Sequence, residues 1–267
     1  MKNTKLIVGD LDGTLIVKHN MLSKRNRDII IKAREKGIYF GIASGRPLDE
    51  LHFYKDWGLD EDFDVVIGLN GCQLKDNVLN TEENYFIMKK EWIKLALDVM
   101  KPFKYNPVMY IGNKMLTNEI TELVIKSASS SKKEIIVAKD ESEFYKEDNF
   151  KIMFRVSEED MPMIEKEIYN MDLGPIRAFK TQSTLLEFSS KEVDKSFTLQ
   201  KFCEHHNISV NDVVAFGDTT NDNGMLEWAG VGVCMENGSD DTKEIADYIC
   251  KSVEEDGVAQ FIEDYIF

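Results

Sequence analysis

The chain has 267 residues and a formal net charge of −15, because 48 acidic side chains outweigh 33 basic ones. This charge argues against a nucleic-acid or anionic-membrane partner, since both are bound through clustered Lys and Arg. Hydrophobic residues make up 43% of the chain, enough for a substantial core, and no apolar run approaches a membrane-spanning length. The four cysteines lack CxxC or zinc-site spacing, which indicates reduced thiols in a cytoplasmic protein.

The first seventy residues alternate predicted strands and helices. Three continuous apolar runs are typical of buried strands, at residues 6–8, 38–43 and 64–68. A helix is predicted to begin after Ser23, a favourable N-cap, and to extend to Lys36, and Pro47 favours the start of another helix. Continuous apolar strands separated by helices predict a parallel sheet that helices cover on both faces.

The pattern changes after Gly71. Residues 72–81 are typical of a hairpin, and the strands and helices between residues 83 and 187 do not alternate strictly, which is typical of an α+β unit. A run of serines and lysines at residues 129–133 predicts a flexible surface loop.

Alternation returns with a predicted helix over residues 196–206, whose last residues, His205 and His206, we expect at an exposed helix end. Further strands are predicted at residues 213–216, 231–234 and 248–250, with helices at 221–228 and 240–246. The chain is therefore predicted to be an α/β protein with a discontinuous core domain, residues 1–82 and 188–267, into which an α+β unit of residues 83–187 is inserted.

Two carboxylates, Asp10 and Asp12, follow the first predicted strand. In open α/β sheets, ligands bind at the edge formed by the carboxyl ends of the strands. An Asp at that edge can attack phosphorus, and a second Asp two residues on can handle the proton. The segment alone fits a strand followed by an Asp-Gly turn equally well.

Polar residues at other strand ends and at one helix start should converge on the same edge: Ser44, Gly45, Arg46, Lys195, Asp218 and Asp222. Crowded carboxylates beside a dianionic phosphate are tenable only with a neutralising cation, and all-oxygen ligands that leave room for water favour Mg²⁺. Lys195 can offset phosphate charge, while the Ser44 hydroxyl and the Gly45 amide can donate hydrogen bonds to its oxygens.

These residues also have purely structural interpretations. Ser44 could cap a helix, and Arg46 could form a surface ion pair instead of lying near a substrate. Asp218 and Asp222 could stabilise a turn and a helix start. A calcium loop beginning at Asp10 is excluded, because its pattern requires Glu at the position that Met21 occupies.

Six segments, taken in order, carry a resemblance to a known family: Asp10–Leu15, Ala43–Pro47, Leu69–Gly71, Lys195, Gly217–Asp222 and Val231–Gly238. Their sequences are DLDGTL, ASGRP, LNG, K, GDTTND and VGVCMENG. The chain resembles the haloacid dehalogenase superfamily, specifically the Cof-type phosphatases with a C2-type α+β cap. The resemblance covers nearly the whole length and is weakest inside the inserted unit. It implies a Rossmann-like core, with the inserted unit as the cap.

The resemblance also implies residue roles. Asp10 would be the nucleophile, and Asp12 would act as the acid and then as the base. Mg²⁺ would bind the side chains of Asp10 and Asp218 and the backbone carbonyl of Asp12, with Asp222 supporting it directly or through water. The phosphate-binding residues would be Ser44, Gly45, Lys195 and Asn221, and the residues near the substrate would be Arg46 and Asn70.

Two departures from the family pattern lie next to these residues. Ser196 follows Lys195 where these proteins usually have Gly, and Asn223-Gly224 follows Asp222 where an apolar residue is usual. Neither departure removes a catalytic group.

We therefore predict a Mg²⁺-dependent phosphatase that hydrolyses a small phosphorylated metabolite, a sugar phosphate, through an aspartyl-phosphate. The cap would close over the substrate and exclude bulk water. Two alternatives remain: a phosphomutase that uses the same aspartyl-phosphate, and a catalytically silent phosphometabolite sensor. No nucleic-acid or membrane partner is expected, and the sequence leaves the oligomeric state open.

Overall fold

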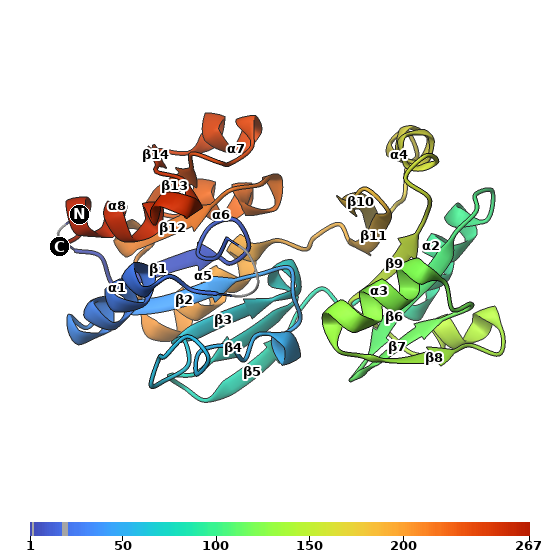
Figure 1. The fold of residues 1–267 in the computed structure, drawn as a ribbon, viewed down its shortest axis with the longest axis horizontal. Helices are drawn as coiled ribbons and strands as arrows, with labels where there is room; N and C mark the ends of the chain where they lie inside the picture. Colours follow the sequence, from blue (N-terminus) through green and yellow to red (C-terminus); the bar gives the residue numbers. More distant parts are fainter. Residues whose placement is uncertain (2, 18–20) are drawn as a thin grey trace. The chain divides into compact units, whose positions relative to one another are not determined.

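The computed structural model describes residues 1, 3–17 and 21–267, which form two compact units (Figure 1). Unit 1 comprises Met1–Tyr85 and Asp194–Phe267, and unit 2 comprises Phe86–Val193. The boundaries predicted after residues 82 and 187 fall inside strands β5 (Thr81–Asn84) and β11 (Leu185–Ser190). β5 is hydrogen-bonded to β4 and belongs to unit 1, and β11 is hydrogen-bonded to β10 and belongs to unit 2. Both boundaries between the units therefore lie a few residues later in the chain than predicted.

Unit 1 contains one sheet with the strand order β14-β13-β12-β1-β2-β3-β4-β5. Neighbouring strands from β14 to β3 are parallel: β1 (Leu6–Asp10), β2 (Tyr39–Ala43), β3 (Val65–Gly68), β12 (Val213–Gly217), β13 (Val231–Met235) and β14 (Tyr248–Cys250). The hairpin of β4 (Gln73–Asp76) and β5 continues the sheet in antiparallel fashion. The parallel strands end at one common edge.

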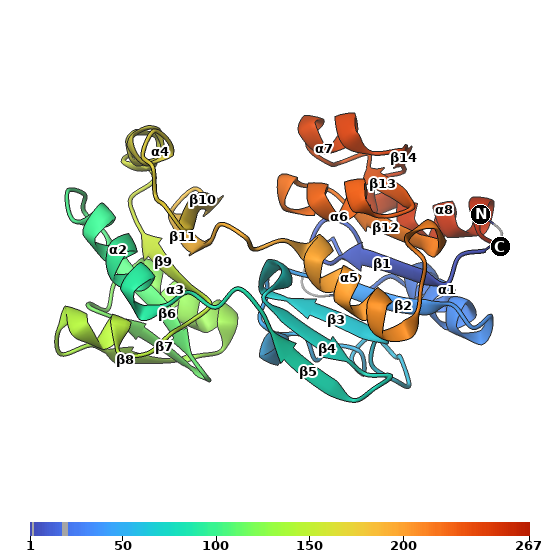
Figure 2. The ribbon, with the colours of Figure 1, turned by 180° about the vertical axis from the view of Figure 1, so that it is seen from behind.

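Helices cover both faces of this sheet, as predicted from its continuous apolar strands (Figures 1 and 2). On one face, a core that includes Ile7 and Phe216 packs against α1 (Lys24–Glu35) and α8 (Gly257–Tyr265). On the other face, Leu6 and Val8 belong to a second core. Two helices contribute to that core, α5 (Lys195–His206) and α6 (Asn223–Trp228), and the remaining helix of unit 1 is α7 (Asp240–Ile245).

Short 3₁₀ turns connect several of these elements: Leu48–Glu50, Leu69–Gly71, Val210–Asp212, Thr220–Asp222 and Val253–Glu255. The helix predicted to start at Pro47 is therefore a single 3₁₀ turn. It ends because Leu51 leaves the helical conformation, with φ −110° and ψ 37°, and is buried in the core.

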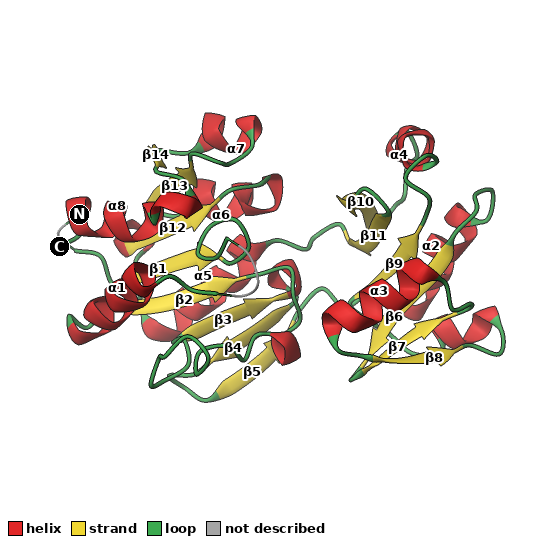
Figure 3. Ribbon diagram, in the orientation of Figure 1, coloured by secondary structure: helices red, strands yellow, loops and turns green. Residues whose placement is uncertain are grey.

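Unit 2 contains a second sheet with the strand order β10-β11-β9-β6-β7-β8 (Figure 3). Its other strands are β6 (Asn106–Ile111), β7 (Lys114–Thr117), β8 (Glu134–Val137), β9 (Lys151–Arg155) and β10 (Ile176–Gln182). Phe154 and Phe188 pack with α2 (Lys90–Met100) and α4 (Met161–Tyr169), while Val108 and Met115 pack with α3 (Glu122–Ser131) on the other face. A 3₁₀ turn spans Glu141–Tyr145. This mixed arrangement confirms the predicted α+β character.

The flexible loop predicted at residues 129–133 is wrong, because α3 continues to Ser131. Ser127 and Ser131 donate their hydroxyl hydrogens to carbonyl oxygens four residues earlier, at 2.9 Å in both cases. This local bonding keeps serines within a helix. The helix ends at Lys132, whose φ of 54° is left-handed. No helix in the described part of the chain combines the length and apolar character that a membrane span needs.

The His206 side chain is only 8% exposed, contrary to its predicted exposure at a helix end, whereas His205 is exposed as predicted. Its Nε2 lies 2.7 Å from Oδ2 of Asp76, a carboxylate at the end of β4 that is completely buried. The other Asp76 oxygen accepts hydrogen bonds from the amides of Val78 and Leu79, both at 3.0 Å. The β4–β5 hairpin thus covers the end of α5, which periodicity within the helix does not reveal.

Asp76→Ala should lower the free energy of unfolding by about 3 kcal/mol, because it leaves two turn amides and a buried histidine without their acceptor. Urea unfolding monitored by circular dichroism checks this value. Asp28→Ala, which removes an exposed carboxylate from a surface ion pair, is the matched control and should leave the urea midpoint nearly unchanged. Equal midpoints for both variants would contradict a stabilising role for the Asp76 contacts.

Candidate active site

The carboxyl ends of β1 and β12 bring buried acids together. These strands are parallel neighbours, with Gly9 opposite Phe216, so Asp10 and the residues after β12 reach the same edge. One carboxylate oxygen from each of Asp10, Asp218 and Asp222 lies within 4.8 Å of the others. Their relative exposures are only 7%, 7% and 0%. The convergence predicted from the strand pattern is therefore present in the structure.

Lys195 lies completely buried among these acids at the first position of α5. Its Nζ is 2.6 Å from Oδ1 of Asp10 and 2.6 Å from Oδ1 of Asp222. The preceding Asp194 caps the helix by accepting a hydrogen bond from the Ser196 amide at 2.6 Å. One ammonium therefore bridges two strand ends of the sheet.

The protonation equilibria reflect this crowding. Burial raises the pKa of Asp10 to about 8, although the charge of Lys195 opposes the shift. Burial, together with the neighbouring Asp222 carboxylate, raises the pKa of Asp218 to about 6. Burial alone would lower the pKa of Lys195, but the carboxylates of Asp10 and Asp222 reverse that effect and raise it. One ammonium among three carboxylates leaves an excess of negative charge.

Asp222 has both carboxylate oxygens engaged by the protein. Oδ1 contacts Lys195, and Oδ2 accepts hydrogen bonds from the amides of Asp218 and Thr219 at 2.9 and 3.2 Å. Asp222 therefore fixes the backbone that carries Asp218. The Asp218 carboxylate accepts its hydrogen bond from a hydroxyl, that of Thr14, at 2.9 Å.

Thr14 and Asn237 are functional candidates that were not predicted from the sequence. Thr14 is completely buried and orients Asp218. Asn237 donates from Nδ2 to the carbonyl oxygen of Gly13 at 2.9 Å and so holds the loop after β1. Gly13 has a left-handed φ of 97°, and a Cβ there would lie 2.5 Å from the Asp218 carboxylate. Both residues lie inside motif segments of the family resemblance, Thr14 in DLDGTL and Asn237 in VGVCMENG, and this position is the sequence signal that points to them.

Asp12 is not one of the three clustered acids, and its side chain is 54% exposed. The Arg46 guanidinium contacts both carboxylate oxygens of Asp12: Nε lies 2.9 Å from Oδ2, and a terminal nitrogen donates to Oδ1. The hydroxyl oxygen of Ser44, which is buried, accepts a hydrogen bond from the Arg46 amide at 3.2 Å. The ion-pair interpretation of Arg46 thus describes a contact that exists. The capping interpretation of Ser44 is wrong, because the turn that follows has Pro47 at its N-cap and no side-chain cap hydrogen bond.

Asn70 and Asn221 form a second polar group at this edge. Asn221 donates from Nδ2 to Oδ1 of Asn70 at 3.0 Å, and a Cβ on Gly45 would lie 3.2 Å from the same oxygen. Asn70 has a left-handed φ of 56° within the turn after β3. All the residues predicted for the site therefore lie on the strand-end loops of unit 1 or at the start of α5.

The donor set fits a divalent cation. Asp10, Asp218 and Asp222 present only oxygens, and with all three ionised, as a bound cation would favour, their charge exceeds that of Lys195 by two negative units. Hard oxygen donors and a net negative charge suit a small divalent ion. The cluster could therefore hold a metal.

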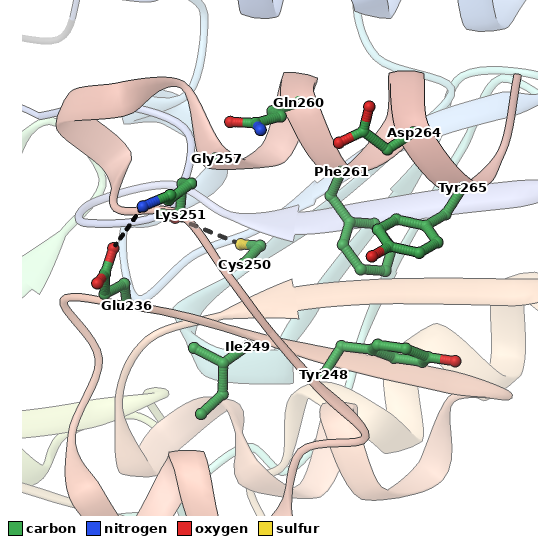
Figure 4. A pocket seen from close by; sticks show the side chains of 10 residues that line it. All are labelled: Glu236, Tyr248, Ile249, Cys250, Lys251, Gly257, Gln260, Phe261, Asp264 and Tyr265. Carbon is green, nitrogen blue, oxygen red and sulfur yellow. Dashed lines mark hydrogen bonds and ion pairs between the residues drawn. The ribbon is translucent and has the colours of Figure 1, made fainter.

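A pocket of about 320 Å³ lies elsewhere in unit 1, between β14 and α8. Figure 4 shows the aromatic side chains of Tyr248, Phe261 and Tyr265 grouped there. The Phe261 ring centroid is 5.6 Å from that of Tyr248 and 4.7 Å from that of Tyr265. None of the predicted site residues lines this pocket, so it is separate from the acid cluster.

Comparisons with known proteins agree in coverage and description. A family model described as haloacid dehalogenase-like hydrolase matches residues 7–262. The 5-amino-6-(5-phospho-D-ribitylamino)uracil phosphatase YitU of Bacillus subtilis is 27% identical, over 97% of this chain and 97% of that protein. Pyridoxal phosphate phosphatase YbhA of Escherichia coli is 26% identical, over 98% and 99%. A haloacid dehalogenase-like hydrolase structure from Bacteroides thetaiotaomicron has a TM-score of 0.85 at 28% identity, covering 99% of this chain and all of that one.

Asp218→Asn should stabilise the protein in EDTA. Between pH 3.8 and about 6, Asp218 is protonated when folded and ionised when unfolded, so it destabilises the fold increasingly as pH rises. The melting temperature of the variant should therefore exceed that of the wild type by roughly 5 °C at pH 7, and by less at pH 4.

The control is Asp212→Asn at the opposite end of β12, where an acid pairs with Lys5 at the surface. Differential scanning fluorimetry across this pH range measures all three proteins. A gain for Asp218→Asn that does not change with pH would contradict the assigned charge crowding.

Proposed function

The chain belongs to the haloacid dehalogenase-like hydrolases and is a phosphoric monoester hydrolase, and we propose that it releases phosphate from a small phosphorylated metabolite through a phosphorylated Asp10. One observation carries this proposal. The Asp10 carboxylate ends a buried parallel strand, contacts the Lys195 ammonium at 2.6 Å and shares a cluster with Asp218. That arrangement suits a nucleophile that must approach a phosphoryl group without being repelled by it.

The reaction balances in two displacement steps. In the first, an Asp10 oxygen bonds to phosphorus while the ester P–O bond breaks, and Asp12 gives its proton to the departing oxygen. In the second, Asp12 takes a proton from water as the water oxygen bonds to phosphorus, and the bond from phosphorus to Asp10 breaks. Inorganic phosphate leaves, Asp10 is again a carboxylate, and Asp12 is again protonated.

The positions of the two acids fit these different tasks. Asp10 is 7% exposed and held by Lys195, as a nucleophile with a fixed direction requires. The Asp12 side chain is 54% exposed, so it can exchange its proton with solvent. We propose that Lys195, Ser44, the Gly45 amide and Asn221 bind the phosphoryl oxygens, and that Arg46 and Asn70 lie near the substrate.

We propose Mg²⁺ as the cofactor, held by the side chains of Asp10 and Asp218 and the backbone carbonyl of Asp12. Bound Mg²⁺ would supply positive charge that neutralises the carboxylates and the phosphoryl oxygens. Asp222 would act behind this set, because its oxygens are occupied by Lys195 and by two backbone amides. Thr14 would keep Asp218 in its orientation.

The substrate class rests on the relatives. Their names specify a ribitylamino-uracil phosphate and pyridoxal phosphate, both of which are phosphate monoesters of small molecules. For this chain we propose a sugar phosphate. The net charge of −15 agrees with a small substrate and disfavours nucleic acid. We also propose a cytoplasmic location, which is supported by the buried thiols of Cys203, Cys234 and Cys250.

Asp10→Asn should lower phosphate release from a panel of sugar phosphates by at least about 1,000-fold while keeping the fold, because an amide cannot form the phosphoryl ester. A colourimetric phosphate assay measures turnover, and circular dichroism checks the fold. Asp212→Asn is the control and should retain full turnover. Undiminished release by Asp10→Asn would refute the nucleophile, and an isomerised sugar phosphate with little free phosphate would identify a mutase.

Mg²⁺ should raise the melting temperature of the wild type, since a ligand that binds only the folded state stabilises it. Asp218→Asn should abolish this rise, because it removes a proposed ligand. Asp222→Asn should lower stability without Mg²⁺ yet keep most of the rise, because Asp222 acts on the protein. Thermal shift titrations with MgCl₂ after EDTA treatment test this. Equal loss of the rise in both variants would contradict this division of roles between Asp218 and Asp222.

A further inference from the structure

We propose that Arg46 is a positioning residue for Asp12, acting on the reaction through that carboxylate and without touching the phosphoryl group. This inference deepens the proposed function and rests on it. The earlier prediction places Arg46 near the substrate. The present inference adds that the guanidinium acts by holding the Asp12 carboxyl group.

The contact between the two side chains uses two points. Arg46 Nε lies 2.9 Å from Oδ2 of Asp12, and a terminal nitrogen donates to Oδ1. Paired parallel N–H donors fix the plane of a carboxylate as well as its distance, which a single ammonium does not do. Asp12 is therefore oriented about both of its side-chain torsions.

Arg46 is itself held firmly. Its amide donates to the Ser44 hydroxyl oxygen at 3.2 Å, and its carbonyl oxygen accepts a hydrogen bond from the Leu69 amide at 2.9 Å. Its guanidinium carbon lies 5.7 Å from the centre of the Phe53 ring, within the range of a cation–π contact. A guanidinium restrained at its backbone and on one face can transmit its position to Asp12.

Asp12 needs such a partner more than the other acids do. Asp10, Asp218 and Asp222 are buried and held by Lys195, Thr14 or backbone amides. The Asp12 side chain is 54% exposed on a loop, and an exposed side chain loses entropy when it must keep one rotamer. A protonated carboxyl keeps acceptor capacity, so Arg46 Nε can hold Oδ2 while Oδ1 carries the proton for the departing oxygen. Without Arg46, Asp12 would spend less time aimed at that oxygen, and misplacement of this kind can cost on the order of 100-fold in rate.

The test separates action through Asp12 from action on phosphate. An alkyl phosphate needs its leaving oxygen protonated, whereas the 4-nitrophenolate of 4-nitrophenyl phosphate leaves without a proton. Since kcat/KM reports steps up to the first irreversible one, we expect Arg46→Met to lower it about 30-fold for the best alkyl phosphate of the panel, and by less than about threefold for 4-nitrophenyl phosphate. Asp12→Ala should show the same discrimination, more strongly.

Two further variants complete the experiment. Arg46→Lys keeps the charge but loses the paired donors, and should recover only part of the alkyl phosphate activity. Arg27→Met removes a partly exposed arginine that pairs with Asp28, and should match the wild type on both substrates. An equal loss on both substrates in Arg46→Met would show that Arg46 acts on the phosphoryl group, and full activity would show no role. Either result overturns the inference.

Failure of the proposed function would look different. It would appear as absent turnover in the wild type with Mg²⁺, or as turnover that survives Asp10→Asn. The selective result expected for Arg46→Met requires an active wild type and an inactive Asp10→Asn, so the two failures cannot be confused.

Discussion

The buried ammonium of Lys195 is the interaction on which the site depends. It lies 2.6 Å from two carboxylates, with no exposed surface of its own. Charges this deep are tolerated only when they are paired, and removing one partner leaves an uncompensated charge in a poorly polarisable interior. β1, α5 and the loop after β12, which are distant in sequence, therefore meet through electrostatics, while apolar packing holds the layers behind them.

Much of the core and its acids could be predicted from the sequence, because both follow from strand direction. Apolar runs indicated parallel strands, and parallel strands place Asp10 and Asp218 at one edge. Side-chain pairing could not be predicted in the same way. The hydrogen bonds between Arg46 and Asp12 depend on the conformation of the loop after β1, in which Gly13 has a left-handed φ. Composition and hydrophobic periodicity do not predict such a torsion angle. His206 was misplaced because a hairpin from another part of the chain covers it.

Asp218 and Asp222 show how environment divides roles between identical side chains. They are four positions apart in the sequence, and both lie among the buried acids. Asp222 is saturated by Lys195 and two amides, whereas Asp218 takes its hydrogen bond from a hydroxyl and has its pKa raised to about 6. The first acid builds the loop, and the second remains available to a cation.

Helix α5 is anchored at both ends by buried polar contacts, Lys195 to Asp10 and Asp222 at its start and His206 to Asp76 at its end. An added or deleted residue within its 12 residues would turn one end by about 100° relative to the other. Both anchors could not then be satisfied together. The two polar contacts therefore fix the number of residues in this helix, whereas its solvent-facing side chains are free of that constraint.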